Sequence, residues 1–370
     1  MIDTMGIILT DDIHINSLTD KRSISALPFA GRYRLIDFVL SSMVNAGIIN
    51  VGVILKQNYS SLMDHLGSGK EWDLNRKSGG LHILPPNIAR NIHGIGEGSV
   101  ELIASARGYL SKSKQKYVIL SKGNIVLNID FDNVMEFHIE NNADITMVYY
   151  EEDSYKEAIT NHTFLSVNDD NRVTDIEVRP RRPKTNKVFL NVMLIDKGYL
   201  QYLIDEAMAR GEQDLVKDIL MKRTSRTNIC GYKFEGHVGD IDSIQSYYDN
   251  NMRMLNANIR KEIFNSSRPI YTKIKDQAPT RYSSDASVNN CLIADGCVIE
   301  GQVKNSIIFR GVHIGKKARV SNSIVMQDSI IQTGCELDYM VMDKEVTVRE
   351  NGRLIGDIRH PIIISKGEIV

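Results

Sequence analysis

Residues 6–55 decide the fold of this chain. They comprise four consecutive segments: GIIL (6–9), TDDIHINSLTDKRSISALPFAGR (10–32), YRLIDFVLSSMVNAGI (33–48) and INVGVIL (49–55). The first and the last are short apolar runs of the kind that form buried strands. Between them, the apolar residues of 34–46 fall on one broad face of a helix, and Gly47 is a natural stop after it. A strand, a long loop, a helix and a second strand make a βαβ unit, which predicts a parallel sheet.

The later part of this stretch, LPFAGRYRLIDFVLSSMVNAGI (27–48), resembles the segment after the nucleotide loop in bacterial ADP-glucose pyrophosphorylases, also called glucose-1-phosphate adenylyltransferases. That family places a glycine-rich loop of the form GGxGTRL before this segment. Here residues 10–18, TDDIHINSL, contain no glycine, although glycines let backbone N–H groups approach a triphosphate closely. Asp11 and Asp12 would add like charge against phosphate. The resemblance is closest to a regulatory-type paralogue in glycogen biosynthesis, whose loop is also without these glycines.

Composition limits the possible functions. The chain has 370 residues with a net charge of −1, which argues against a general nucleic-acid or membrane-surface role. No run reaches the roughly 18 apolar residues of a membrane-spanning helix, and the first residues do not resemble a signal peptide. The four cysteines form no CxxC pattern, so we expect free thiols in a reducing cytoplasm rather than a zinc site.

Alternating strand and helix patterns continue to about residue 258 and predict one α/β domain with a mostly parallel sheet over residues 1–258. Residues 259–284 are expected to form a linker. From Asp285 onward, apolar residues recur at close to every sixth position, with slips. They are Ile308, Ile314, Val320, Met326, Ile331, Leu337, Met342 and Val348. This period predicts a β-helix of four or five coils over 285–370, with a β-sandwich as the weaker alternative.

A hexapeptide β-helix behind a nucleotidyltransferase-like, Rossmann-like domain is also the architecture that the resemblance implies, with a left-handed parallel helix. The family holds Mg²⁺ with one Asp in a GDH motif and a second in a DVGT motif. These positions match Asn124 in LSKGNIVLNID and Asp240 in GHVGDIDSIQSYY. Asn124 is a neutral and poorer Mg²⁺ ligand, which leaves Asp240 as a residual metal candidate. Without the resemblance, Asp240 could equally be the N-cap of a helix that begins at Ile241.

Other catalytic positions of the family are also degenerate. Its lysine before the phosphate-facing segment falls on Ser25, and its sugar-phosphate lysine falls on Arg179 in EVRP. The stretch that faces the base and phosphates is matched by GSVEL, which keeps only Gly98 and the hydroxyl of Ser99 as weak nucleotide-binding candidates. The resemblance therefore implies no intact catalytic set. Because losing one preorganised electrostatic group costs about 10²–10³ in rate, we expect the combined losses to leave no measurable activity.

Four basic residues match anion-binding effector positions of the family: Arg22, Arg34, Lys344 and Lys366. If they converge from the two domains, they would suit a phosphorylated effector such as a sugar phosphate. The plainer interpretation, solvated surface charges, stays open.

The resemblance therefore implies a non-catalytic or barely catalytic regulatory subunit of glucose-1-phosphate adenylyltransferase. Such a subunit needs no cofactor, and Mg²⁺ only for residual activity. Its partner would be the catalytic paralogue in a hetero-oligomer such as a tetramer, or copies of itself. Coil faces over 308–348, rich in Ile, Val and Met, would form the contact. The alternatives are an active sugar-phosphate nucleotidyltransferase with a divergent loop, and an acyltransferase that uses His313 inside the coils.

Overall fold

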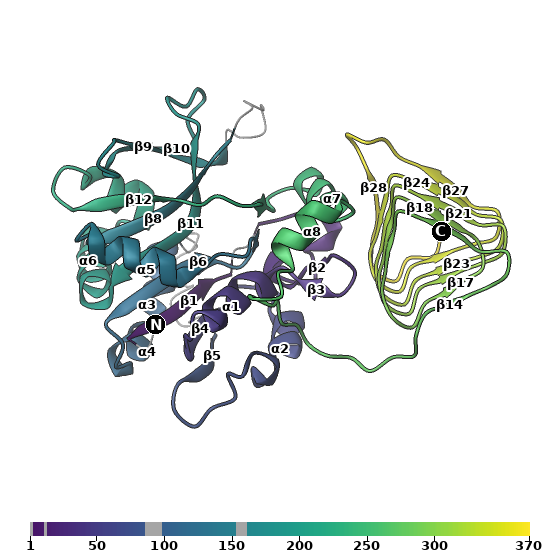
Figure 1. The fold of residues 1–370 in the computed structure, drawn as a ribbon, viewed down its shortest axis with the longest axis horizontal. Helices are drawn as coiled ribbons and strands as arrows, with labels where there is room; N and C mark the ends of the chain where they lie inside the picture. Colours follow the sequence, from purple (N-terminus) through teal and green to yellow (C-terminus); the bar gives the residue numbers. More distant parts are fainter. Residues whose placement is uncertain (1–2, 11–12, 86–97, 153–160) are drawn as a thin grey trace.

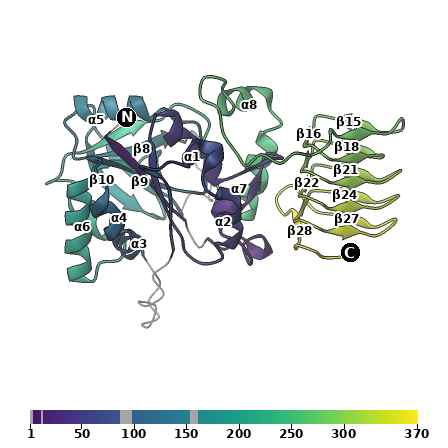
Figure 2. The same cartoon turned by 90° about the horizontal axis from the view of Figure 1, so that it is seen from below.

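The computed structural model of the protein describes residues 3–10, 13–85, 98–152 and 161–370. An α/β domain and a three-sided β-helix lie side by side and are joined by an extended segment (Figure 1). In a perpendicular view, the coils of the β-helix stack in parallel layers (Figure 2). The predicted order, an α/β domain followed by a parallel β-helix, is confirmed.

A nine-stranded sheet forms the centre of the α/β domain, in the order β10-β9-β11-β6-β1-β4-β5, with β8 pairing with β11 and β12. Its strands are β1 (Thr4–Leu9), β4 (Asn50–Ile54), β5 (Gly80–Leu84), β6 (Tyr117–Lys122), β8 (Ile145–Glu151), β9 (Thr163–Val167), β10 (Val173–Val178), β11 (Lys187–Asp196) and β12 (Ile229–Lys233). β6, β1, β4 and β5 pair in parallel, as do β12 and β8, whereas β11 is antiparallel to β6, β8 and β9. β10 is antiparallel to β9, so β10 and β11 run opposite to the other strands of the sheet; the sheet is mostly parallel in strand direction, as predicted from the first βαβ unit.

Helices cover both faces of this sheet because alternate strand residues point to opposite sides. Ile7 belongs to one buried cluster with α3, α4 and α6, and Ile8 to another with α1 and α5. The helices are α1 (Ile36–Asn45), α2 (Ser60–Leu66), α3 (Ser99–Ser105), α4 (Arg107–Lys112), α5 (Phe131–Glu140), α6 (Lys197–Arg210), α7 (Ile244–Arg253) and α8 (Ala257–Ile263). Asp130 and Asp132 are both candidate caps for α5, and the structure has Asp130 as the N-cap, whose side chain accepts a hydrogen bond from the backbone N–H of Asp132.

Two predicted helices differ in the structure. The apolar pattern of residues 99–110 predicts one continuous helix, but the structure interrupts it at Ala106, between α3 and α4. The helix expected to begin at Ile241 begins at Ile244 instead, because Ser243 and Ser246 form a capping box there. Asp240 is therefore not an N-cap; it lies in β13 (Gly239–Asp240).

Each side of the β-helix is a five-stranded parallel sheet. The first comprises β14 (Arg281–Tyr282), β17 (Val298–Ile299), β20 (His313–Ile314), β23 (Ile330–Ile331) and β26 (Thr347–Val348). The second comprises β15 (Ser287–Asn289), β18 (Gln302–Lys304), β21 (Arg319–Ser321), β24 (Glu336–Asp338) and β27 (Arg353–Ile355). The third comprises β16 (Leu292–Ile293), β19 (Ile307–Ile308), β22 (Ile324–Val325), β25 (Met340–Met342) and β28 (Ile362–Ile364).

The eight periodic apolar residues of this region are all buried, at 0–1% exposure, as the six-residue pattern predicted. The slips have a structural cause: Ile308 pairs with Val325 and Val325 with Met342, so one side of each of these coils is a residue shorter than six. The expectation of apolar coil faces for a partner is wrong, however. Apart from Ile330, every Ile, Val and Met between 308 and 348 is buried inside the β-helix or against the α/β domain.

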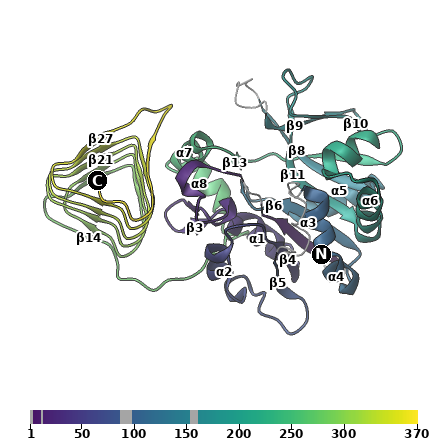
Figure 3. The same ribbon diagram turned by 180° about the vertical axis from the view of Figure 1, so that it is seen from behind.

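The two domains share a third buried cluster. Leu18, Phe29 and Tyr247 contribute from the α/β domain, and Phe309 and Met326, which directly follow strands of the third sheet, contribute from the β-helix. α7 and α8 lie on the side of the α/β domain that faces the β-helix (Figure 3). α8 straddles the expected boundary at residue 258, and β14 begins before the expected start at 285. The seam between the domains is thus a continuous part of the core.

Two features bear on the environment of the chain. Within the described ranges, no helix is both long and apolar enough to cross a membrane. All four cysteines are free thiols, and Cys230, Cys297 and Cys335 are buried.

Candidate functional site

The candidate site lies at the carboxyl edge of the sheet, where parallel strands end. Asn124 follows β6, and the next two residues form β7 (Ile125–Val126), which pairs with β13 in antiparallel orientation. This short ladder brings Asn124 next to Asp240 although the two are far apart in the sequence. The Asn124 amide nitrogen donates to Asp240 Oδ1 at 3.3 Å and to the Ile241 carbonyl at 2.8 Å.

A histidine that the sequence analysis did not single out completes this cluster. His162 Nε2 lies 3.2 Å from Asp240 Oδ2, and each of the two side chains is 15% exposed. Both oxygens of the residual metal carboxylate therefore face nitrogen atoms of the protein. No sequence motif indicated this contact, because His162 precedes β9 and reaches Asp240 only through the fold of the sheet.

The donor set does not fit Mg²⁺. The Ile241 carbonyl can only accept a hydrogen bond, so it fixes the Asn124 amide with its nitrogen toward Asp240. Magnesium requires oxygen ligands, usually carboxylates, in octahedral geometry. In the part of the chain that the structure describes, no group of three His, Cys, Asp or Glu side chains is arranged to hold a metal ion. In a metal site, a cation would lie between two carboxylates at these positions. Here the Asn124 amide nitrogen contacts the Asp240 carboxylate directly instead.

The segment in place of the glycine loop packs as part of the core. Thr10 Oγ1 donates to the Ile54 carbonyl at 3.0 Å, which extends the contact between β1 and β4. Ile15 and Leu18 are buried in the cluster shared by the two domains. Asp11 and Asp12, expected to repel phosphate, lie outside the described residues. The described part of the loop uses apolar anchors where a phosphate cradle would need exposed N–H groups.

The next turn brings no positive charge to the site. Ser25 is fully buried, and its neighbour Ile24 is fully buried as well. A Cβ atom at Gly123 would lie 2.5 Å from Ser25 Oγ, so the turn packs tightly against the residue before Asn124. The structure therefore brings Ser25, Asn124 and Asp240 to the same edge, without a lysine among them.

The other degenerate positions are engaged by neighbouring backbone. Ser99 Oγ accepts a hydrogen bond from the Leu215 N–H at 2.8 Å, and Gly98 packs against the Gln213 carbonyl. Arg179 is exposed, and its N–H donates to the His162 carbonyl at 3.0 Å, which places it beside the Asp240 cluster.

The basic residues gather at the seam between the domains. Arg22 is 5% exposed and donates through Nη2 to both oxygens of Asp343, at 2.8 and 2.7 Å. Arg34 donates through Nη1 to the Ser61 carbonyl at 2.6 Å. Lys366 is more exposed and lies 3.2 Å from Glu345. Lys344 follows Asp343, the partner of Arg22, and its carbonyl accepts from the Gly367 N–H next to Lys366.

Burial and like charge strongly perturb two of these cations. Burial, together with the nearby positive charges of Arg34 and Arg22, lowers the pKa of Lys344 to about 7, against the opposing effect of Asp343. Burial likewise lowers the pKa of Arg34 to about 10, although Asp37 acts in the opposite direction. These mutual effects mean that Arg22, Arg34 and Lys344 share one partly buried region.

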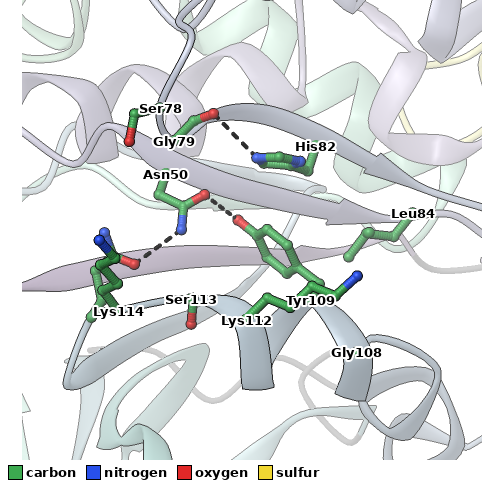
Figure 4. A pocket seen from close by; sticks show the side chains of 11 residues that line it. Asn50, Ser78, Gly79, His82, Leu84, Gly108, Tyr109, Lys112, Ser113 and Lys114 are labelled. Atoms are coloured by element: carbon green, nitrogen blue, oxygen red, sulfur yellow. Dashed lines mark hydrogen bonds between the residues drawn. The ribbon is translucent and has the colours of Figure 1, made fainter.

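A pocket of about 540 Å³ opens at the opposite, amino edge of the sheet, where β4 and β5 begin (Figure 4). Asn50 accepts a hydrogen bond from the Tyr109 hydroxyl at 2.7 Å and donates one to Gln115 at 3.0 Å. Lys112 and Lys114 also line the pocket. None of the sequence-predicted site residues is among the side chains drawn, so this pocket is separate from the carboxyl edge.

His313, the candidate of the acyltransferase alternative, is half-exposed in β20. Its Nε2 lies 3.2 Å from Glu300 Oε2, and its side chain is 46% exposed. No described contact joins it to the seam or to the Asp240 cluster.

Comparisons with known proteins agree with both domains. Residues 14–257 match the nucleotidyl transferase family, and residues 276–359 match the GlmU-like C-terminal hexapeptide family. The chain is 35% identical over 354 residues to the glycogen biosynthesis protein GlgD of Bacillus subtilis, which covers 95% of this chain and 92% of that protein. It is 40% identical over 310 residues to GlgD of Geobacillus stearothermophilus, covering 83% and 79%. It is 31% identical over 344 residues to the glucose-1-phosphate adenylyltransferase of Acetivibrio thermocellus, covering 91% and 79%.

Proposed function

The chain belongs to the nucleotidyl transferase family, among the relatives of GlgD and glucose-1-phosphate adenylyltransferase, and from this premise we propose that it is a regulatory, non-catalytic subunit. The enzyme it serves is a glucose-1-phosphate adenylyltransferase of bacterial glycogen biosynthesis, which converts ATP and glucose 1-phosphate to ADP-glucose and diphosphate. One observation carries the proposal: the Asp240 carboxylate is held by the Asn124 amide and by His162.

The chemistry of that contact favours a protein without turnover. Transfer of a nucleotidyl group depends on a divalent cation that neutralises the phosphates and positions them in line. An amide nitrogen at Asn124 excludes the second carboxylate of such a site, and the buried turn at Ile24 and Ser25 supplies no cation in its place. The protein therefore needs no cofactor for its role.

Regulation would act through the basic residues at the seam. Arg34 and Lys344 lie in one partly buried region that belongs to both domains, and Lys366 occupies the position equivalent to Lys344 in the next coil. Arg22 is held by Asp343, but its Nη1 is buried without a hydrogen-bond partner among the described residues. A phosphate-type effector such as a sugar phosphate would supply the missing acceptor and would favour the charged form of Lys344.

The partner is the catalytic paralogue, in a hetero-oligomer. Exposed apolar side chains gather in the last coil of the β-helix, where unpaired strand edges also occur. They are Ile355, Ile358, Ile362, Ile369 and Val370, each at least 36% exposed. This end of the β-helix replaces the coil faces as the surface that we assign to the partner.

A mixing experiment tests the function. The protein is combined with the catalytic glucose-1-phosphate adenylyltransferase of the same organism, and complex mass and steady-state kinetics are measured with and without sugar phosphates. We expect a shared complex and a changed effector response, with no turnover by this chain alone. Separate species with unchanged kinetics would refute the regulatory role. Robust ADP-glucose formation by the isolated chain would instead support the alternative, an active nucleotidyltransferase that retains Asp240.

A further inference from the structure

A second basic site lies along the seam, away from Lys344. The coils place Asp295, Arg310, Gln327 and Lys344 in one column, because each residue follows the third sheet of the β-helix at the same position. The carbonyls of Asp295, Arg310 and Gln327 accept from the N–H groups of Gly311, Asp328 and Glu345 in the next coil. Since adjacent strands are about 4.8 Å apart, the backbones of Arg310 and Lys344, two coils apart, are separated by roughly 10 Å.

Arg310 is an unusual residue for this column. It is 5% exposed, and its Nε and Nη2 are both buried without a hydrogen-bond partner among the described residues. These two nitrogens form one edge of the guanidinium, the edge that binds two oxygens of a carboxylate or phosphate side by side. A buried charge is costly unless an opposite charge or hydrogen-bond acceptors compensate it. The Nε and Nη2 groups of Arg310 are therefore placed to donate two hydrogen bonds, and only the acceptor is missing.

A second arginine stands at the same place on the α/β domain. The turn between β2 (Pro28–Phe29) and β3 (Tyr33–Arg34) lies over this coil, with Gly31 in the left-handed region at φ 83° and close to the Ile308 carbonyl. Arg32, in that turn, is exposed, and its guanidinium carbon lies 5.8 Å from the centre of the Tyr33 ring. After burial, the positive charge of Arg32 is the next cause that lowers the pKa of Arg310.

The opposing charges near Arg310 are few. Asp295, one coil before it, is exposed and raises the pKa of Arg310, as does Tyr33. No described hydrogen bond joins Asp295 to the guanidinium. Beyond Arg310 in the column, Gln327 Oε1 is also buried without a partner among the described residues. The net charge around Arg310 is therefore positive, and the buried polar atoms of Arg310 and Gln327 have no hydrogen-bond partner among the described residues.

We propose that Arg310 and Arg32 form a binding site for a phosphate- or sulfate-type oxyanion at the domain seam, distinct from the site of Arg22, Arg34 and Lys344. The Nε–Nη2 edge of Arg310 donates to two oxygens of the anion from the β-helix. Arg32 closes the exposed side from the turn of the α/β domain. Because the anion touches both domains, it stabilises their contact.

Sulfate is the probe, because its charge does not change near neutral pH. Calorimetric titrations use the full chain, with sodium chloride at matched ionic strength as the reference. Lys344→Met serves as the background, so that any binding at Lys344 is removed. In this background we expect sulfate binding to persist, Arg310→Met and Arg32→Gln each to weaken it by about tenfold or more, and Asp295→Asn to strengthen it. Arg319→Met is the matched control: Arg319 is exposed on another side of the β-helix, and its loss should leave sulfate binding unchanged.

Thermal unfolding separates binding from folding. Without sulfate, Arg310→Met should melt at the same temperature as the parent chain or higher, since an unpaired buried cation is removed. With sulfate, only chains that keep Arg310 should gain stability. Equal sulfate binding with and without Arg310, absence of sulfate binding in the Lys344→Met background, or a lower melting temperature of Arg310→Met without sulfate would each overturn the proposal. If Lys344→Met alone binds sulfate exactly as the wild type does, the effector role of Lys344 fails while this site stands.

Discussion

Arg22 and Asp343 form a buried ion pair that joins the first thirty residues of the chain to the last thirty. The Arg22 Nη2 atom lies 2.7 Å from Asp343 Oδ2, and the two side chains are 5% and 1% exposed. One partner belongs to the segment after the glycine-free loop and the other to the fourth coil of the β-helix. The pair therefore fixes the two domains to each other at the basic region of the seam.

We first predict that Arg22→Met destabilises the protein strongly, by about 3–5 kcal/mol, because it leaves the Asp343 carboxylate buried without its partner. The double variant Arg22→Met/Asp343→Asn should recover much of this loss, which urea unfolding of the four chains of the cycle would measure. Arg353→Met, which breaks the exposed pair with Glu336, is the matched control and should have little effect. Additive losses in the double variant would contradict the prediction.

Sulfate binding at the Lys344 region should weaken as the pH rises. With a pKa of about 7, Lys344 is charged below pH 7 and neutral above it, so its contribution to sulfate affinity should fall by about tenfold between pH 6 and pH 8. Lys344→Arg should remove this pH dependence, because arginine stays charged. Sulfate titration in an Arg310→Met background isolates the contribution of Lys344. A sulfate affinity that does not change between pH 6 and pH 8 would be evidence against this prediction.

The same group should affect stability in the absence of anions. Its pKa is lowered from 10.5 in the unfolded chain to about 7 in the folded one, so between these values the unfolded state binds more protons. The free energy of unfolding should then rise with pH from about 7 to about 10.5 through this group. Lys344→Met should flatten that rise, as measured by urea unfolding at several pH values. If the free energy of unfolding depends on pH identically in wild type and variant, Lys344 does not cause the rise.

Asn124→Asp should not restore ADP-glucose formation. The new carboxylate would face Asp240, while the loop would still lack a phosphate cradle. In buffer without metal, the variant should lose about 1–3 kcal/mol, since the Ile241 carbonyl loses its donor and two like charges approach. Mg²⁺ should recover part of this loss.

Asn128→Asp provides the control for that experiment. Asn128 donates to two carbonyls, those of Ile263 and Arg268, and no described hydrogen bond joins it to a carboxylate. It should lose stability without being rescued by Mg²⁺. Robust turnover by Asn124→Asp would show that the loop is not limiting, and equal rescue of both variants would show that Mg²⁺ acts elsewhere.

Leu18→Ala tests whether the glycine-free loop serves the core. Leu18 is fully buried in the cluster shared by the domains, so truncation should cost about 2–5 kcal/mol in urea unfolding. Ile139→Ala, at a position 58% exposed on α5, should cost much less. Similar small losses for both variants would mean that the loop contributes little to the seam.

Apolar patterns predicted most of the fold. The runs that became β1 and β4 pair in parallel, and the six-residue period of the coils predicted which side chains point inward. Local capping was harder to predict: Asp240 and Ser243 both precede α7, and only the hydrogen bonds of Ser243 with Ser246 decide between them. The six-residue period does not indicate whether a residue on the outside of a coil faces solvent or the other domain. For this reason the apolar faces over 308–348 were wrongly assigned to a partner.

The chemistry of the site was only partly visible in the sequence. The replacement at Asn124 could be predicted from the resemblance, but the contact of His162 with Asp240 depends on how β9 approaches β13 in three dimensions. Arg310 carries no motif either. Its column forms because the coils advance by 15 residues between Ile293 and Ile308 and by 17 between Ile308 and Val325, an irregular spacing that hides the relation.

The cluster shared by the domains also determines when each part can fold during synthesis. Leu18 and Phe29 leave the ribosome early, whereas their partners Phe309 and Met326 belong to the second and third coils of the β-helix, which are translated much later. At about 5–20 residues per second, the interval is on the order of 15–60 s. Throughout that time the nascent α/β domain carries an uncovered apolar surface, a natural target for ribosome-associated chaperones. The second and third coils of the β-helix are therefore what completes the core of the first domain.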